Sequence, residues 1–276
     1  MKNYLAILLA LVMAVSLMGC SGNQEETVPT EPEVTAAPET EAPTEMVIDT
    51  EEKLDAALQY SGYVELGASL ELTRHVVMSN DGVLDGCGNI LTGPQYVEGV
   101  PATENGITMR SGRLKNITVR DAYRCIGDSK ENPQTGNVRL ENVTVDGPSY
   151  ALNFGYGDFT GQLIADGSTF LGWSSYTGLD AATFTDCTFG WDSTGANGNL
   201  RPYVDTILIG CTFEGKTADD GSTVPFNISL RESISGITIT LEDCYVGDTL
   251  LTQENVFELL NLELFENELY VSNSEG

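Results

Sequence analysis

Two aromatic segments carry side chains of the kind that bind sugars. One reads Trp173-Ser-Ser-Tyr176, and the other begins at Trp191 and ends with Arg201 and Tyr203. Aromatic rings offer a sugar an apolar surface, and polar groups at their edges can bond its hydroxyls. Arginine adds a planar cation that suits glycan and protein contacts. The residues that we predict to bind a ligand are therefore Trp173, Tyr176, Trp191, Arg201 and Tyr203.

A second cluster, Arg120-Asp121 with Arg124 and Asp128, could support a polysaccharide lyase reaction. Such a reaction needs an arginine or lysine as the base and usually a calcium ion held by acidic side chains. Calcium would be a cofactor only under this hypothesis, and otherwise we expect none. The alternative is a solvated ion-pair network at a turn, which we favour because Arg120 directly follows a predicted strand. The single histidine, His75, also lies in a predicted strand, and we expect a structural or surface histidine without a catalytic role.

Whether these side chains meet depends on a six-residue sequence repeat, here called the phrase, that recurs through the chain. Its copies start 19 to 33 residues apart, a spacing typical of a stacked array of repeats. They occupy residues 114–119, 140–145, 165–170, 184–189, 208–213 and 241–246. Trp173 and Trp191 follow the third and fourth copies by three and two residues. We therefore expect both tryptophans on one face; the alternative is that their rings pack the loops against the stack.

Each copy of the phrase predicts two short strands joined by a bend. Positions 1, 4 and 6 are mostly apolar and positions 2 and 5 mostly polar, as in strands with one buried face. Positions 1 and 4 have the wrong parity for one straight strand, so the chain must bend at position 3. The residues there are Asn116, Asn142, Gly167, Asp186, Gly210 and Asp243, types that accept a left-handed backbone at low cost. The pattern predicts a parallel β-helix, because one turn alone cannot bury its apolar side.

Five cysteines follow residue 20, and three of them occupy position 4 of the phrase. These three are Cys187, Cys211 and Cys244, and we expect them to form a column inside the stack. An odd number of cysteines without a Cys-x-x-Cys pair argues against a disulfide framework and against a metal site. We expect mostly buried thiols that pack as small apolar groups.

The segment ahead of the repeats combines a helical pattern over 50–60, with Asp49 as its N-cap, and short strands from Tyr63 onward. It continues with Leu84-Asp-Gly-Cys-Gly-Asn89. This combination resembles the opening of right-handed β-helix proteins of the pectate-lyase-like superfamily, and the resemblance covers roughly 47–246. It implies an all-β fold, a right-handed parallel β-helix solenoid with an N-terminal capping helix and a small C-terminal cap. The Gly-His-Gly and Arg-Ile-Lys motifs of glycoside hydrolases on this fold are absent.

Lys2 precedes an apolar run from Tyr4 to Leu17, and the run ends Leu17-Met-Gly-Cys20. This segment resembles the signal of a bacterial lipoprotein. The resemblance implies that Cys20 carries a diacylglyceryl group, whose two acyl chains anchor a protein durably. Residues 21–45 are rich in Glu, Thr and Pro and contain no aromatic residue, so we expect an extended tether. The predicted location is the extracytoplasmic face of a bacterial cell membrane.

These patterns divide the chain into five predicted parts. They are a signal peptide (1–19), the acylated cysteine and tether (20–46), the cap helix (47–62), the β-helix (63–250) and the C-terminal cap (251–276). The cap helix would cover the open end of the stack, where strand edges are otherwise unpaired.

The composition narrows the choice of partners. The chain has 41 acidic and 13 basic residues and a net charge of −28, with no basic stripe that could meet phosphates. This balance excludes nucleic acid as a partner. We expect a monomer that contacts the membrane through its lipid and binds a glycan or a surface protein without catalysis. The two alternatives are a polysaccharide lyase and a purely structural surface protein.

Overall fold

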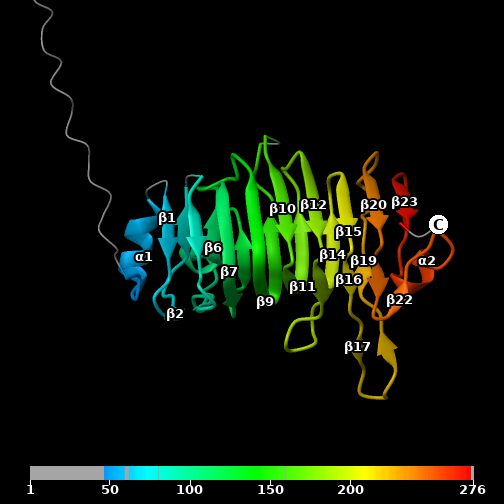
Figure 1. Ribbon diagram of the computed structural model, residues 1–276, viewed down its shortest axis with the longest axis horizontal. Coiled ribbons are helices and arrows are strands. Elements are labelled where there is room, and N and C mark those ends of the chain that lie inside the picture. Colours follow the sequence, from blue (N-terminus) through cyan, green and yellow to red (C-terminus); the bar gives the residue numbers. More distant parts are fainter. Residues whose placement is uncertain (1–46, 60–61, 80, 159, 275–276) are drawn as a thin grey trace, which may run out of the picture. The chain divides into compact units, whose positions relative to one another are not determined.

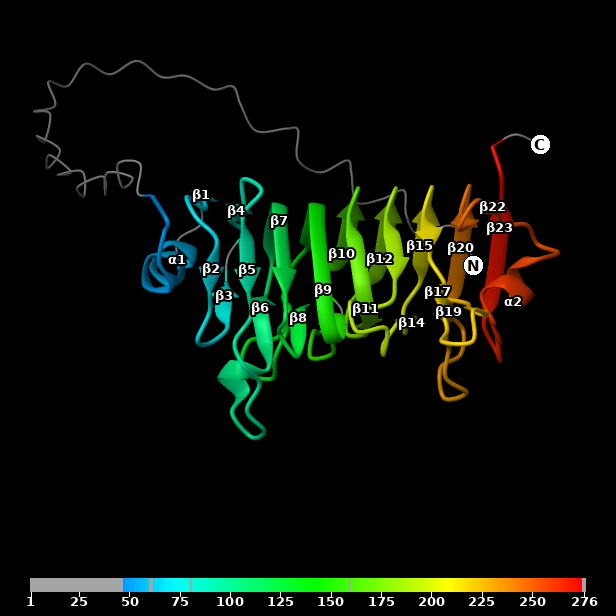
Figure 2. The same cartoon turned by 90° about the horizontal axis from the view of Figure 1, so that it is seen from below.

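The computed structural model describes residues 47–59, 62–79, 81–158 and 160–274. The predicted signal peptide, Cys20 and tether fall on residues 1–46 and lie outside the described residues. The described part is mostly β, with a long sheet of parallel strands that curls around a hydrophobic core (Figures 1 and 2). None of its helices is long and apolar enough to cross a membrane.

The chain passes through three columns of parallel strands, and we call each turn of the chain a rung; the last rungs that the structure describes have no strand in the third column. The first column contains β1 (Tyr63–Glu65), β4 (Val83–Asp85), the start of β7 (Gly112–Arg120), the start of β9 (Val138–Phe154), β10 (Gln162–Asp166), β12 (Ala181–Thr185), β15 (Thr206–Ile209), β20 (Thr238–Glu242) and β23 (Glu268–Ser272). The second contains β2 (Leu70–Glu71), β5 (Ile90–Thr92), the end of β7, the middle of β9, the start of β11 (Thr169–Tyr176), β13 (Thr188–Gly190), β16 (Thr212–Phe213) and β21 (Tyr245–Val246). The third contains β3 (Val76–Met78), β6 (Asn105–Met109), β8 (Arg124–Gly127), the ends of β9 and β11, β14 (Asn199–Pro202) and β19 (Asn227–Ile228).

The remaining elements lie at the ends of the stack or project from it. They are α1 (Glu51–Leu58), the short 3-10 helix η1 (Pro101–Thr103), β17 (Lys216–Thr217), β18 (Thr223–Val224), β22 (Thr249–Leu250) and α2 (Val256–Leu259). Strands β17 and β18 pair as an antiparallel hairpin that projects from the stacked strands (Figure 1).

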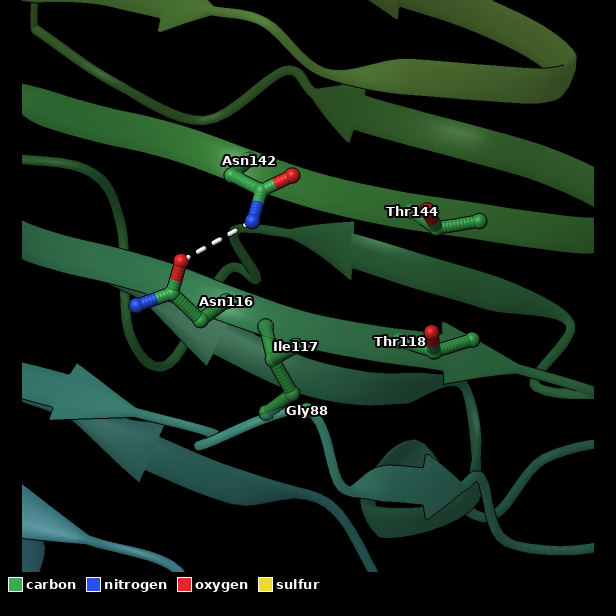
Figure 3. Close-up of a pocket in the computed structure, with 6 residues that line it drawn as sticks. All are labelled: Gly88, Asn116, Ile117, Thr118, Asn142 and Thr144. Carbon is green, nitrogen blue, oxygen red and sulfur yellow. Dashed lines mark hydrogen bonds between the residues drawn. The ribbon is translucent and has the colours of Figure 1, made fainter.

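The bend at position 3 of the repeat is confirmed in all six copies. The six residues there have φ between +50° and +61°. They lie above one another because the strands on both sides of each bend pair in register. Figure 3 shows two of them, where Asn142 Nδ2 donates to Asn116 Oδ1 at 2.9 Å. Asn116 Nδ2 donates in turn to Asp85 Oδ1 at 3.1 Å, so hydrogen bonds link the first bends of the stack.

Phenylalanines fill much of the interior at position 6. Phe170, Phe189 and Phe213 stack on successive rungs, with ring centroids 5.4 and 5.6 Å apart. All three are fully buried, and each such side chain contributes roughly 1.5–3 kcal/mol relative to an exposed one. The stacked rings hold neighbouring rungs together and keep the outward side chains at a fixed spacing.

The predicted cysteine column at position 4 is also confirmed. Cys187, Cys211 and Cys244 are buried on successive rungs, and the five described cysteines are all free thiols. Each of the three Sγ atoms donates to the carbonyl oxygen two residues earlier, at 3.2 to 3.5 Å. Each thiol therefore donates a hydrogen bond to a backbone carbonyl group beside its bend.

The two ends of the stack differ from the predicted caps in detail. The N-cap of α1 is Thr50, whose Oγ1 accepts from the backbone N–H of Lys53 at 3.3 Å. The predicted N-cap, Asp49, instead pairs with the Lys53 ammonium group. At the other end, β23 pairs in parallel with β20, so the sheet continues into the predicted C-terminal cap.

Candidate functional site

An outward row of aromatic rings follows the third column of strands. The ring centroids of Tyr96 and Tyr123 are 4.4 Å apart, those of Tyr123 and Tyr150 6.2 Å, and those of Tyr150 and Trp173 5.3 Å. The first pair is stacked and the other two meet edge to face. Tyr150 and Trp173 are direct partners in the register of β9 and β11. We call the four rings, together with Arg124 and Arg201, the aromatic face.

The two arginines of the aromatic face lie over its rings. Arg124 Cζ is 5.7 Å from the ring centroid of Tyr123, and Arg201 Cζ is 4.8 Å from that of Trp173. Arg124 also pairs with Glu104 at 3.0 Å, whereas Arg201 has no ion pair with any described residue. In both arginines the Nε–H group is buried without a hydrogen-bond partner among the described residues. Unpaired buried donors are uncommon in native proteins, and Arg110 Nε and Trp191 Nε1 are also buried without a partner among the described residues, so this feature is not particular to the aromatic face.

Polar side chains accompany the rings in the adjacent outward row. Asn153, Ser175 and Arg201 are register partners on β9, β11 and β14. Asn199 is the partner of Trp173 on the next rung, and its Oδ1 accepts from Ser229 Oγ at 2.9 Å. The face thus offers amide, hydroxyl and guanidinium groups beside aromatic edges, a combination that suits a sugar.

Each lysine or arginine in the second half of the chain, after residue 139, lies over an aromatic ring. After residue 139 the sequence contains only three lysines or arginines. The pairs are Arg201 over Trp173 at 4.8 Å, Lys216 over Trp191 at 4.0 Å and Arg231 over Tyr203 at 5.9 Å. In a chain with a net charge of −28, this places the positive charge of that half beside its outward aromatic residues.

Three of the five predicted binding residues share one outward surface. Trp173 and Arg201 are half-buried and alternate with buried neighbours along β11 and β14, and half-buried Tyr203 directly follows β14. Tyr176 is fully buried, and its hydroxyl group lies 3.2 Å from Thr206 Oγ1. The prediction that Tyr176 binds a ligand is therefore wrong. It lies three residues after Trp173 in one strand, and an odd spacing places two side chains on opposite faces.

Trp191 lies in a different row from Trp173. Gly190 is the register partner of Leu171, so Trp191 leaves the sheet one position before the row of Trp173. Its ring packs against Gly198, where an added Cβ atom would lie 2.6 Å from the indole. With the Lys216 ammonium group above it, Trp191 packs its own loop, which was the alternative considered for both tryptophans.

The loop over 191–198 reaches back across the sheet. The Asp192 carboxylate shapes it by accepting from two backbone N–H groups of the loop at 2.9 and 3.0 Å. The Ser193 N–H group donates to Asp146 Oδ1 at 3.0 Å, and Asn197 Nδ2 donates to the Pro148 carbonyl oxygen at 2.7 Å. Asp146 and Pro148 belong to β9, so the loop passes over the rung between.

The four residues of the lyase hypothesis do not form one cluster. Arg120 and Asp121 are exposed and pair with each other at 3.3 Å, as in the ion-pair alternative. Arg124 belongs to the aromatic face. Asp128 is fully buried at the far end of β8, and its carboxylate accepts from three backbone N–H groups at 2.8 to 3.3 Å. Burial raises the pKa of Asp128 even though these hydrogen bonds act to lower it.

Among the described residues, Glu65, Asp85 and Cys87 form a group whose ligand atoms could reach one metal ion, within 4.8 Å of one another. Asp85, however, already accepts from Tyr63 Oη at 2.6 Å and pairs with Lys115 Nζ at 2.8 Å. Burial acts to raise the pKa of Asp85, but these two contacts outweigh it and hold the pKa below the usual range. The Lys115 ammonium group would repel a cation at this carboxylate, so we assign no metal to it.

The three tyrosines of the aromatic face are not among the residues that we predicted to bind a ligand. Tyr123, Tyr150 and Trp173 follow the ends of three successive repeats by four, five and three residues. A recurring aromatic residue in that window was the available signal, but the variable offset hides it from a search at fixed spacing.

No family model, curated protein or solved structure matches this chain.

Proposed function

We propose that this chain is a non-catalytic surface protein that binds a glycan along its aromatic face. The observation that carries the proposal is the row from Tyr96 to Trp173, in which four rings lie 4.4 to 6.2 Å from one to the next. A chain-like ligand laid along the stack would meet a new ring on each rung. Arg201 covers one side of Trp173, so such a ligand would meet ring edges and the guanidinium edge together.

The proposed scaffold is a right-handed parallel β-helix. Three columns of parallel strands, six left-handed bends in register and inward rows of phenylalanine and cysteine support it. Connections between parallel strands are right-handed in nearly all proteins, which supports the proposed hand. A scaffold of this kind keeps outward rows of side chains at a constant spacing and so suits an extended ligand.

Binding without catalysis is the better proposal because the candidate catalytic groups are dispersed or already engaged. A general base must reach the proton that it removes, and a metal must find unoccupied ligands. Asp128 is enclosed by backbone N–H groups, and Arg120 is paired with Asp121 at the surface. The aromatic face, in contrast, presents four neighbouring rings with two guanidinium groups over them.

A comparison of two tryptophan variants tests the binding proposal. The full chain, in non-ionic detergent, is screened on a glycan array, and the best ligand is titrated by calorimetry. Trp173→Ala should weaken binding by about 2 kcal/mol, roughly 30-fold in Kd, because aromatic anchors dominate such surfaces. Trp191→Ala is the matched control and should leave Kd unchanged. Equal losses in both variants would contradict the aromatic face, and the absence of binding to every glycan would favour a purely structural protein.

Anchoring through Cys20 is the second part of the proposal, and it places the protein on the extracytoplasmic face of a bacterial membrane. The support is the sequence Leu17-Met-Gly-Cys20 after an apolar run. In a bacterial host, the wild-type protein should fractionate with membranes and carry a diacylglyceryl mass on Cys20. Cys20→Ser should lack that mass and lose processing at this position. A wild-type protein without the lipid mass would refute the anchor while leaving the glycan proposal intact.

A further inference from the structure

Two arginines stand side by side on the outside of the first column of strands, away from the aromatic face. Arg113 of β7 and Arg139 of β9 are direct partners in parallel register. Neighbouring strands lie about 4.8 Å apart, so the two side chains leave the sheet one strand spacing from each other. Like charges directly opposite each other destabilise a sheet, and this pair occurs in a chain that has few basic residues.

The protein neutralises only one of these two cations. Arg113 Nε pairs with Glu141 Oε1 at 3.3 Å, and both side chains are about 40% exposed, at 42% and 39%. Arg139 forms no ion pair with any described residue. A guanidinium group without a carboxylate, beside a second guanidinium group, leaves charge that an anion from solution can balance.

A hollow of about 410 Å³ opens over the two arginines. Its lining includes Asp81, Val83, Arg113, Asn137, Arg139 and Thr160. Asn137 Oδ1 accepts from the backbone N–H of Gln162 at 3.0 Å, which leaves its Nδ2 group as a further donor. Asp81 is the one carboxylate in the lining, and it forms no ion pair with either arginine.

We propose that this hollow binds a phosphate or sulfate group, carried by a small ligand and held between Arg113 and Arg139. A tetrahedral oxyanion presents several acceptor oxygens, and the guanidinium fork matches such oxygens in pairs. A phosphate ester carries a charge of about −1.5 to −2 near neutral pH, which offsets two facing arginines. The volume of the hollow exceeds that of a bare ion and lies within the range of small-molecule sites, about 300–1,000 Å³.

The test uses the thermal stability of the full chain in non-ionic detergent. Sodium phosphate and sodium sulfate are compared with sodium chloride at matched ionic strength, and binding of inorganic phosphate is measured by calorimetry. In the wild-type protein, phosphate and sulfate should raise Tm above the chloride value. Arg139→Gln should lose the greater part of that rise, keeping only the stabilisation that excluded salts give any protein, and should weaken phosphate binding at least tenfold. Arg120→Gln is the matched control, because this exposed arginine pairs only with Asp121, and it should respond like the wild type.

Two further measurements distinguish a ligand site from a structural contact. In chloride alone, Arg139→Gln should be at least as stable as the wild type, because it removes one of two facing cations. Asp81→Asn should bind phosphate more tightly than the wild type, because it removes a carboxylate from the lining. Equal Tm in phosphate and chloride, an unchanged phosphate response in Arg139→Gln, or an acetate effect as large as that of phosphate would each overturn the proposal.

Discussion

The edge formed by the bends and the aromatic face are both rows of side chains that run along the same stack. The bend row has six members, each with φ near +50° to +60°, and none of them is replaced by a residue that resists this conformation. The aromatic row covers four rings and then gives way to Asn199, the register partner of Trp173 on the next rung. The row that the backbone requires repeats on six consecutive rungs, whereas the row proposed to bind a ligand covers four. Substitutions should therefore affect stability at the first row and affinity at the second.

The largest expected effect is on the bend row, at Asn142. Asn142→Val places a β-branched residue at φ +52°, which costs about 1–2 kcal/mol, and removes a hydrogen bond worth about 1 kcal/mol. We expect a loss of about 2–3 kcal/mol in the free energy of unfolding, measured by urea titration. Asn142→Gly keeps the conformation and should lose only the hydrogen bond. Equal losses in the two variants would show that the left-handed bend is not the reason for asparagine.

Asp85, which accepts a hydrogen bond from the bend residue Asn116, should make stability depend on pH. Its folded-state pKa lies below the usual value, so its contribution is complete above the ordinary pKa of about 3.9 and disappears as pH falls toward the folded value. Asp85→Asn should cost about 2 kcal/mol at neutral pH, because hydrogen bonds to a charged group are lost. The difference between variant and wild type should shrink below about pH 4, as followed by urea titrations at several pH values. A constant difference across this range would contradict the assigned ionisation.

On the aromatic face, Arg201→Gln should change affinity more than stability. The guanidinium group contributes a cation–π contact of about 0.5–1 kcal/mol and its N–H donors, so we expect glycan binding to weaken about fivefold. Urea titration should show little change in the free energy of unfolding. Arg231→Gln, which removes the exposed arginine over Tyr203, provides the comparison and should weaken binding less. A stability loss in Arg201→Gln larger than its affinity loss would make Arg201 a structural residue.

The smallest effect concerns reactivity and not energy. Cys87 is exposed, whereas Cys125 and the three thiols of the inner column are buried. A maleimide reagent should therefore label Cys87 in the native protein, although more slowly than a free thiol because desolvation and the nearby Asp85 carboxylate raise its pKa, and the four buried thiols only after unfolding. Mass spectrometry of labelled peptides identifies the sites. Labelling of Cys211 in the native protein would show that the stack opens locally at that rung.

The features that could be predicted from the residues are those with a strict period. Position 3 of the repeat predicted the bends, and position 4 predicted the cysteine column, because both depend only on parity and on backbone conformation. Tyr176 was predicted to bind a ligand together with Trp173, although it lies three residues from Trp173 in one strand. Parity within β11 would have assigned it to the core.

The features that could not be predicted from the residues depend on connections whose lengths vary from rung to rung. The tyrosines of the aromatic face follow the repeat at unequal offsets, so only the structure shows that they adjoin. Arg113 and Arg139 each precede position 1 of a repeat by one residue, and that shared offset could have placed them side by side. Their unbalanced charge, in contrast, could not be predicted, because it depends on which carboxylates reach them.

The loop over 191–198 has a mechanical consequence. In a stack whose rungs contact only their neighbours, a pulling force on one end should unfold the rungs one after another. Ser193 and Asn197 form hydrogen bonds with the rung of β9, so the rung between cannot unfold until these hydrogen bonds break. Three turns in the middle of the chain should therefore resist pulling as one block, with the weaker turns on either side yielding first.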